Sequence, residues 1–468
     1  METIENRTFD ELSVGDSASL TRTLTRHDIQ LFAVMSGDVN PAHVDDEYAA
    51  SDMFHKVIAH GMWSGALIST VLGTQLPGPG TIYLGQSLRF LKPVGLGDSV
   101  TVTLTVARLD AAKRRATLDC VVTNQDHEQV VTGTAEVIAP AKKVARPRAI
   151  LPEVSLRERG GRYRALLAAA RDAPRVCTAV VHPVDTVSLL GAIEAARVGL
   201  IDPLLVGPES RIRDAAAQAG IDLAGVRIVA TEHSHAAAEA AVALARAGEV
   251  QAIMKGALHT NELMHAVVAR GSGLRTARRI SHVYALDVPT YPRPLFITDA
   301  AVNVVPTLED KRDIIQNAID LAHALGIATP RVAILSALEN VFPKISSTIE
   351  AAALCKMAER GQITGAVVDG PMAFDLAVSS DAAKAKGFVS PVAGCADILI
   401  APDLEAGNML AKQLEYLAEA QVAGIVLGAR VPIMLTSRAD GPLARLASCA
   451  LAVLLARARA ALPASAPP

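Results

Sequence analysis

The chain has 468 residues, of which half are apolar and only 3% are aromatic, and its formal net charge is −3. The chain is longer than a typical domain with a single hydrophobic core, so two or three domains are expected. The nearly balanced charge excludes a strong electrostatic field for nucleic acid or for a membrane surface. Five scattered cysteines without a CxxC pair predict buried thiols in a reducing compartment.

The first residues, METIENRTFDEL, are polar and acidic, and they lack the basic and apolar regions of a signal peptide. No stretch of 18 apolar residues without charge occurs, so no membrane span is predicted. We therefore expect a cytoplasmic enzyme.

One domain boundary is visible in the sequence. Residues 139–152, APAKKVARPRAILP, combine proline, alanine and basic residues without an amphipathic period, which is typical of a linker. The expected division is an N-terminal domain at 1–140, a linker at 141–152 and a C-terminal domain at 153–468.

The N-terminal elements follow in a clear order. Thr25 is placed to cap a helix that carries Ile29, Phe32 and Ala33 on one face. A polar loop, SGDVNPAHVD at 36–45, precedes a helix that starts near Gly61, is apolar nearly all round and ends at Pro77-Gly78. Such a helix needs to be wrapped by other elements. Four alternating segments supply strands for this purpose, at 81–91, 99–109, 115–124 and 129–139. An α+β fold, with a curved antiparallel sheet around one helix, is predicted.

The C-terminal part has a different rhythm. Short apolar runs alternate with alanine-rich helical stretches, and each run ends in Gly, Asp, Ser or Pro; the runs are CTAVV, PLLVG, AIMKG, PLFITDA, RVAILSA, GAVVDG, ADILIAP and AGIVLGA. This pattern predicts an α/β domain with a mostly parallel sheet. Ligands of such sheets bind beyond the carboxyl ends of the strands, where the polar residues stand.

In the loop at 36–45, Asp38 and His43 are separated by an Asn40-Pro41 turn, so both side chains can reach one point. Adding water to an activated double bond needs such an acid and base. The thioester oxygen would need a backbone N–H donor, which Gly61 offers at a helix start. The alternative for an isolated D-x-x-x-x-H pattern is a capping Asp and a structural His.

The wider string resembles the signature of MaoC-like, hydratase-2-type (R)-specific enoyl-CoA hydratases over about residues 8–140. Their S-G-D-x-N-P-x-H and F-x-x-x-I-A-H-G-M elements are complete at 36–43 and 54–62. The resemblance implies a hot-dog fold and the reversible hydration of trans-2-enoyl-CoA to (R)-3-hydroxyacyl-CoA. It also implies that Asp38 and His43 are catalytic, that the Gly61 N–H lies in an oxyanion hole, and that Asn40 and His60 help to bind substrate.

His60 belongs to this signature, and we expect it to position the loop rather than to transfer protons. We interpret His55 as a surface residue. No carboxylate or third ligand stands at a regular spacing from these histidines, so no metal site is predicted.

The C-terminal part contains no G-x-x-x-x-G-K-[ST] and no G-x-S-x-G motif, and GSGLRT at 271–276 lacks the third glycine of a dinucleotide fingerprint. What it does contain resembles the phosphate acetyl/butyryl transferase family over about 155–460. The motifs are T-D-A-A-x-N, D-G-P-x-A-x-D, A-G-x-A-D-I-L-x-x-P-x-L-x-A-G-N and L-x-S-R. The segments at 347–357 and 368–375 favour the butyryl branch.

The resemblance implies two α/β subdomains with a cleft, at about 153–289 with 433–468 and at about 290–432. It also implies the reaction acyl-CoA + phosphate ⇌ acyl phosphate + CoA, in which Ser437 and Arg438 lie in the active cleft. An arginine fork suits phosphate because it binds two oxygens at once. The position of the family's proposed carboxylate base is Ala444 here, a departure, and Asp440 is the weak substitute; the alternative for Asp440 is a turn residue.

Other strand-end residues are candidates for substrate binding. Lys255 would contact phosphate, with a solvent-exposed lysine as the alternative. Asn408 would bind ligand or cap the next helix, and we favour the cap. The remaining candidates for substrate binding are Thr298, Asp299 and Asp369. The alternative for the two aspartates is that they only organise the loops at the strand ends.

The predicted protein is thus a bifunctional acyl-CoA enzyme that uses CoA thioesters and phosphate as substrates without a metal or a covalent cofactor. A homo-oligomer is expected, with dimer contacts in both domains and a hexamer as one form. Two alternatives stay open: a transferase-like domain that serves only as an acyl-CoA sensor and oligomerisation module, and an inactive hot-dog domain that serves as a scaffold.

Overall fold

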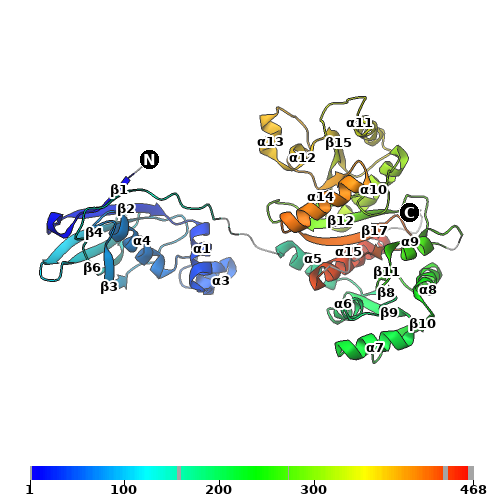
Figure 1. Ribbon diagram of the computed structural model, residues 1–468, viewed down its shortest axis with the longest axis horizontal. Coiled ribbons are helices and arrows are strands. Elements are labelled where there is room, and N and C mark those ends of the chain that lie inside the picture. Colours follow the sequence, from blue (N-terminus) through cyan, green and yellow to red (C-terminus); the bar gives the residue numbers. More distant parts are fainter. Residues whose placement is uncertain (1–2, 155, 157–159, 272, 436–440, 462–468) are drawn as a thin grey trace. The chain divides into compact units, whose positions relative to one another are not determined.

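A computed structural model describes residues 3–154, 156, 160–271, 273–435 and 441–461. The chain divides into two compact units, residues 1–157 and 158–468, and Figure 1 labels their elements. None of the described helices has the length and apolar character that crossing a membrane requires.

In the first unit, the described residues form an antiparallel sheet in the order β2-β4-β5-β6-β3, and α4 packs on β2, β3 and β4. This arrangement confirms the predicted helix and four strands. Strand β2 was not predicted, because SASLTRT is too polar to show an apolar period. The bounds are β1 Thr3–Glu5, β2 Ser17–Thr23, α1 Arg26–Ser36, α2 Pro41–Val44, α3 Asp46–Ser51, α4 Gly61–Thr74, β3 Ile82–Phe90, β4 Ser99–Asp110, β5 Arg115–Thr123, β6 Gln129–Ile138 and β7 Ala145–Pro147, with a 3₁₀ turn at Phe9–Glu11.

The core of this unit lies between α4 and the sheet. On β4 every second side chain is at most 1% exposed, namely Val100, Val102, Leu104 and Val106. These residues belong to the same buried cluster as Leu67, Ile68, Val71 and Leu72 of α4. Full burial of such a side chain stabilises the fold by about 1.5–3 kcal/mol. Packing between α4 and the sheet therefore stabilises the position of the helix, including its first turn, which begins at Gly61.

The expected linker at 141–152 is partly wrong. Strand β7 pairs with β1, and the buried Asn6 donates through Nδ2 to the carbonyl oxygens of Pro79 and Lys142. Residues up to Pro147 therefore belong to the first unit, whose boundary falls at residue 157. A two-stranded ribbon held by backbone bonds needs no alternating apolar pattern, so the composition of this segment hid it.

In the described part of the second unit, one 11-stranded sheet has the order β10-β9-β8-β11-β18-β17-β12-β13-β16-β14-β15. Every apolar run quoted above forms a strand in it. The strands are β8 Val176–Val181, β9 Ile201–Gly207, β10 Arg227–Ala230, β11 Ala252–Lys255, β12 Ser281–Asp287, β13 Leu295–Thr298, β14 Arg331–Leu335, β15 Val367–Met372, β16 Ile398–Ile400, β17 Gln421–Leu427 and β18 Ile433–Met434. The helices are α5 Gly161–Arg171, α6 Thr186–Arg197, α7 Glu209–Ala219, α8 Ser234–Ala247, α9 Thr260–Val268, α10 Leu308–Ala324, α11 Ser346–Glu359, α12 Phe374–Val378, α13 Ser380–Ala385, α14 Leu404–Leu417 and α15 Pro442–Ala460.

The strand directions divide this sheet into two parallel blocks. Strands β10, β9, β8, β11 and β18 run one way, whereas β13, β16, β14 and β15 are parallel to one another. Between the blocks, β17 is antiparallel to β18 and β12, and β12 is antiparallel to β13. The blocks therefore run in opposite directions, and their carboxyl ends lie at opposite edges of the sheet. The strands of the first block come from residues 176–255 and 433–434 and those of the second from residues 295–400, with β12 and β17 as the seam, and the expected subdomain ranges stay a prediction.

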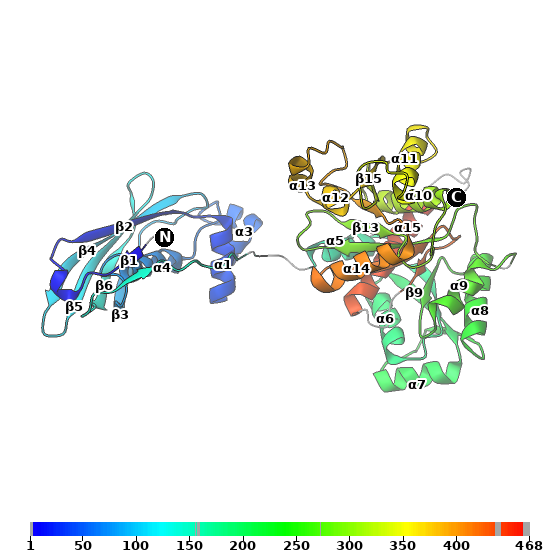
Figure 2. The ribbon, with the colours of Figure 1, turned by 45° about the horizontal axis from the view of Figure 1, so that its top comes forward.

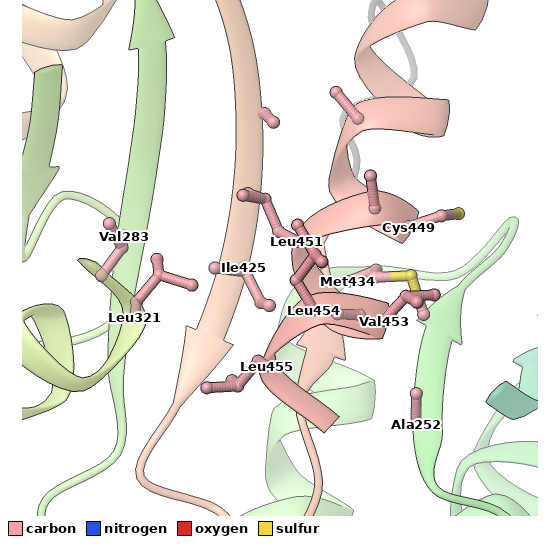
Figure 3. Packing of buried hydrophobic residues seen from close by; sticks show 14 of the residues in the cluster. Ala252, Val283, Leu321, Ile425, Met434, Cys449, Leu451, Val453, Leu454 and Leu455 are labelled. Carbon is pink, nitrogen blue, oxygen red and sulfur yellow. The ribbon is translucent and has the colours of Figure 1, made fainter. Parts of the chain in front are cut away.

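Helices α15 and α14 cover the two faces of this seam (Figures 1 and 2). Figure 3 shows Leu451, Leu454 and Leu455 of α15 beside Ile425 of β17, and all four belong to one buried cluster. On the other face, Ala411 of α14 packs with β12 and β13 residues in a separate cluster. Side chains of β12 alternate between these two layers, so Val283 contacts the first cluster and Leu286 the second.

Candidate active sites

The first site starts where α1 ends. Gly37 caps α1 with a φ of 76°, which reverses the chain. The Oγ of Ser36 then accepts from the Asp38 N–H at 3.2 Å, and Asp38 Oδ1 accepts from the Asn40 N–H at 3.1 Å. The Asn40 side chain caps α2 by accepting from the Ala42 N–H. These short polar contacts shape the loop and place Asp38 just ahead of His43.

His43 is buried, and its Nδ1 lies 2.9 Å from the carbonyl oxygen of Ile58. Since a carbonyl only accepts, Nδ1 is the donor in this contact. His60 lies beside it, with 4.0 Å between the ring centroids, and donates from Nε2 to the carbonyl oxygen of Asp38 at 3.0 Å. One ligand atom each of Asp38, His43 and His60 lies within 4.8 Å of the others. The fold thus brings the predicted acid and base together, and His60 fixes the backbone of Asp38.

A cavity of about 330 Å³ adjoins this group. Gly61 forms part of its wall as the first residue of α4, where backbone N–H groups have no acceptor within the helix. A Cβ at Gly61 would lie 3.2 Å from Cε1 of Phe90, so a larger residue would press on the opposite wall. The lining residues are His43, Phe54, Ile58, Ala59, His60, Gly61, Ser64, Phe90, Leu91, Lys92, Pro93, Val94 and Val131.

The wall from Phe90 to Val94 was missed by the sequence analysis. It begins at Phe90, the last residue of β3, and no local sequence pattern links it to the loop. His55, by contrast, is exposed as expected, and its Nδ1 lies 3.3 Å from the carbonyl oxygen of Ala50. The Asp38, His43 and His60 set is the one group of three possible metal ligands found within the described ranges, and the absence of a bound metal stays a prediction.

In the second unit, Asp299 organises the loop that follows β13. It is 3% exposed and accepts from the backbone N–H groups of Ala301, Val302 and Asn303. Thr298, also buried, donates from Oγ1 to the carbonyl oxygen of His282 at 2.8 Å. Both side chains therefore serve the protein's own backbone, which supports the alternative role given to Asp299.

Asn408 does not cap α14, so the favoured interpretation of this residue was wrong. Asp403 is the cap and accepts from the Ala406 N–H. Asn408 instead donates from Nδ2 to the carbonyl oxygen of Ala300 at 3.0 Å and thereby ties α14 to the Asp299 loop. The neighbouring Gly407 allows this approach, because a Cβ there would lie 2.4 Å from the Asp299 oxygen.

Asp369 stands on β15, where its Oδ1 accepts from the Gly370 N–H at 2.8 Å. Burial raises the pKa of the nearby Cys355 thiol to about 12, and the Asp369 carboxylate adds to this shift. Cys355 is therefore a protonated thiol at neutral pH.

Lys255 ends β11 and is only 7% exposed, which excludes the solvent-exposed alternative. It lies on β11, whereas Thr298 ends β13, and the strands β18, β17 and β12 lie between these two in the sheet. The strand-end candidates therefore do not converge on one point. Met254 pairs with Met434, so the chain leaves β18 beside Lys255 and then enters residues 436–440. The predicted Ser437, Arg438 and Asp440 fall outside the described residues.

Three residues near this exit were missed by the sequence analysis. His282 and Tyr284 share one face of β12, with 4.4 Å between ring centroids, and Lys412 Nζ lies 5.9 Å from the Tyr284 ring. A Cβ at Gly424 would lie 2.9 Å from His282 Nε2 and 3.2 Å from the Leu435 oxygen. The alternation in SHVYALD would have placed both aromatic rings on one face, but it gave no sign that Leu435 is close.

Burial lowers the pKa of His282 to about 4, while Asp299 raises it and Lys412 lowers it further. Between pH 6.5 and 4 the unfolded chain binds this proton and the folded chain does not, so stability falls as the pH falls. We expect a loss on the order of 3 kcal/mol across that window. Urea unfolding of the wild type and of His282→Asn at pH 7, 6, 5 and 4.5 checks this, because the variant should lack this part of the pH dependence. Parallel profiles for the two proteins would contradict it.

Comparison with known proteins identifies both parts. Residues 230–453 match the family model of phosphate acetyl/butaryl transferase, and residues 14–130 match that of the MaoC like domain. A phosphate acetyltransferase of Rhizobium meliloti is 62% identical over 300 residues, covering 64% of this chain and 95% of the relative. A phosphate butyryltransferase of Clostridium acetobutylicum is 40% identical over 287 residues, covering 61% and 95%. The chain is thus more similar to this phosphate acetyltransferase than to this phosphate butyryltransferase, whereas the motifs favoured the butyryl branch.

Among solved structures, a branched-chain phosphotransacylase from Enterococcus faecalis V583 is 28% identical with a TM-score of 0.54, covering 60% of this chain and 99% of that one. This likeness agrees with the sheet and helices of the second unit. The chain belongs to the phosphate acetyl/butyryl transferase family and carries a MaoC-like domain of the hot-dog fold ahead of its transferase part.

Proposed function

We propose that the first unit reversibly hydrates trans-2-enoyl-CoA to (R)-3-hydroxyacyl-CoA and that the second reversibly transfers an acyl group between CoA and phosphate. The observation that carries the first activity is the meeting of Asp38 and His43 beside a cavity walled by Gly61. The second rests on family membership and on the relatives named phosphate acetyltransferase and phosphate butyryltransferase.

In the hydration, Asp38 takes a proton from water, and the hydroxide adds to C3 of the enoyl group. Electrons move toward the thioester oxygen, and the N–H of Gly61 stabilises the charge that develops there. The proton that Asp38 took from water is then passed to C2 under the guidance of the His43 imidazole, so both side chains return to their starting state. The α4 dipole adds favourable potential at the same point. Hydroxyl and proton are both delivered to the substrate, so the reverse path is dehydration by the same groups.

In the transfer, a phosphate oxygen attacks the thioester carbonyl, and the tetrahedral intermediate collapses with loss of the CoA thiolate. No enzyme nucleophile is needed, and the demand is for cations that orient phosphate and stabilise the oxyanion. Arg438 is the proposed fork for phosphate, with Ser437 as its neighbour in the sequence. The buried Lys255 ends β11, which pairs with β18, the strand before them in the sequence.

A steady-state screen of the full chain tests both activities. Enoyl-CoA hydration and phosphate-dependent release of CoA should each be measured over C2 to C8 thioesters. Detectable turnover of both kinds is expected. If only hydration is detected, the second unit would be assigned the alternative role of an acyl-CoA sensor. If only transfer is detected, the first unit would be assigned the alternative role of a scaffold.

Gly61→Ala tests the oxyanion position. The added methyl meets Phe90 at 3.2 Å, so the N–H of residue 61 should shift by a few tenths of an ångström, and we expect kcat/KM for crotonyl-CoA to fall about tenfold. Gly73→Ala is the matched control, because it lies in the same helix with nothing within 4 Å of its Cβ. Equal hydration rates for the two variants would remove Gly61 from the proposed mechanism.

The assembly is proposed to be a homo-oligomer. Strand β3 stands at one edge of its sheet and exposes apolar side chains, among them Ile82, Leu84 and Phe90. An exposed apolar edge of this kind favours association of copies of the chain.

A further inference from the structure

A group of arginines stands at the sheet edge where β13 and β17 end and β12 begins. The strands of the first block, including β11, run away from this edge, as the strand directions show. A cavity of about 240 Å³ lies there, and it is lined by Val268, Arg275, Arg278, Arg279, Ile280, Val302 and Asn303. We call it the arginine pocket. Neither candidate active site uses it.

The backbone that carries these arginines is held by bonds from several elements. Arg275 pairs with Ala429 in an isolated bridge, and the Arg430 N–H donates to the Leu274 oxygen at 2.9 Å. Thr276 donates from Oγ1 to the Gly428 oxygen at 2.7 Å. The three guanidinium groups therefore extend from a fixed segment, so a ligand would meet cations whose attachment points are already ordered.

Arg279 is oriented by the Asp299 loop. Asn303 is 2% exposed, its N–H and Nδ2 both donate to the Asp299 carboxylate, and its Oδ1 accepts from Arg279 Nε at 2.6 Å. Among the described residues, the contacts of Arg279 side-chain nitrogens use Nε alone, including a 3.6 Å approach to Asp310. Its terminal nitrogens are thus aimed by a buried chain of polar contacts. This gives the T-D-A-A-x-N motif a physical role.

Three arginines and no carboxylate are among the described residues that line the pocket, while Asp310 and Asp313 contact Arg279 beside it. Arg278 pairs with Asp320, and burial lowers the pKa of the neighbouring Arg459, with Arg278 adding to that shift. Neither Arg275 nor Arg430 has a side-chain ion pair within the part of the chain that the structure describes. Cations that line one cavity repel one another, and a bound anion would offset this repulsion.

We propose that the arginine pocket binds a phosphoryl group. Guanidinium forks match phosphoryl oxygens in pairs, and a dianion with several free oxygens can engage more than one fork at once. Inorganic phosphate and the phosphates of a CoA thioester share this chemistry. The proposal goes beyond the proposed function, because it concerns binding at a pocket outside both candidate active sites and requires no turnover.

Isothermal titration of the full chain with inorganic phosphate, CoA and dephospho-CoA tests the proposal at low salt. In Arg275→Ala we expect one class of binding sites to weaken about tenfold. Loss for inorganic phosphate identifies free phosphate as the ligand. Loss for CoA but not for dephospho-CoA identifies the 3′-phosphate, and equal loss for both identifies the diphosphate.

The control is Arg270→Ala, which removes the same charge from an exposed residue of the same segment that does not line the pocket. If Arg275→Ala and Arg279→Lys both bind all three compounds as the wild type does, the proposal is overturned. Binding is measured without catalysis, so an inactive transferase or hydratase would not be mistaken for an empty pocket.

Asn303 acts in this proposal as a positioning residue. Asn303→Ala should weaken phosphoryl binding in the wild type but add little in the Arg279→Lys background, where the Nε contact is already gone. A merely structural role would give the same additional loss in both backgrounds, which would remove Asn303 from the proposal.

Discussion

Asp38→Asn should reduce the hydration of crotonyl-CoA by about a hundredfold to ten-thousandfold in kcat, the range that a positioned general base contributes. The amide keeps the shape of the side chain and can still accept from the Asn40 N–H, so the loop should stay folded. It cannot take a proton from water. The substrate KM should change little, because the lost interaction is with the reacting water. Stopped-flow absorbance of the enoyl thioester measures the rate directly.

Asp46→Asn is the control for this experiment. Asp46 is an exposed carboxylate on α3 that pairs with Arg26, so its loss changes the local charge equally without touching the cavity. Its hydration rate should remain within twofold of the wild type. Hydration that survives in Asp38→Asn would show that Asp38 is not the base and would move the assignment to His43.

Arg438→Ala should reduce phosphate-dependent release of CoA from acyl-CoA by at least a hundredfold. Removing one electrostatic group aimed at developing charge commonly costs about that much, and a phosphate fork contributes to positioning as well. The KM for phosphate should rise with the loss of the fork. A thiol-trapping assay with acetyl-CoA and butyryl-CoA, followed over phosphate concentration, separates the two effects.

Arg457→Ala is the matched control, because Arg457 is exposed in the last turn of α15. Hydration by the first unit should be unaffected in both variants, which confirms that the chain is intact. An Arg438→Ala protein with an unchanged transfer rate would remove Arg438 from the proposed site. If neither the wild type nor the variant transfers the acyl group, the alternative in which this unit serves as an acyl-CoA sensor would be favoured.

The first unit was largely predictable because its patterns are local. Strict alternation from Val100 to Val106 gave a strand, and an apolar helix bounded by Gly61 and Pro77 gave the element that it wraps. The proximity of Asp38 and His43 was predictable for the same reason, since they are five residues apart across an Asn-Pro turn. The cavity wall at Phe90 was not, because only the pairing of β3 with β6 brings it there.

In the second unit the strands could be predicted, but their directions could not. The sequence of a strand that is buried on both faces does not indicate whether the strand runs parallel or antiparallel to its neighbours. The reversal at β12 and β17 therefore stayed hidden, as did the strand order that separates Lys255 from Asp299. Asn408 shows the same limit, since its contact with Ala300 joins segments that lie 108 residues apart.

The place of β18 and α15 in the sheet sets the order in which the chain can fold as it is synthesised. Strand β18 fills the gap between β11 and β17, and α15 covers β17, yet both come from residues after 432. Until the ribosome releases these last residues, β11 and β17 each keep an unpaired edge. The first unit ends at residue 157. The first unit can therefore fold before the last strand and helix of the second unit have been synthesised. A chain truncated before residue 433 would leave β11 and β17 each with an unpaired edge, and such edges favour aggregation.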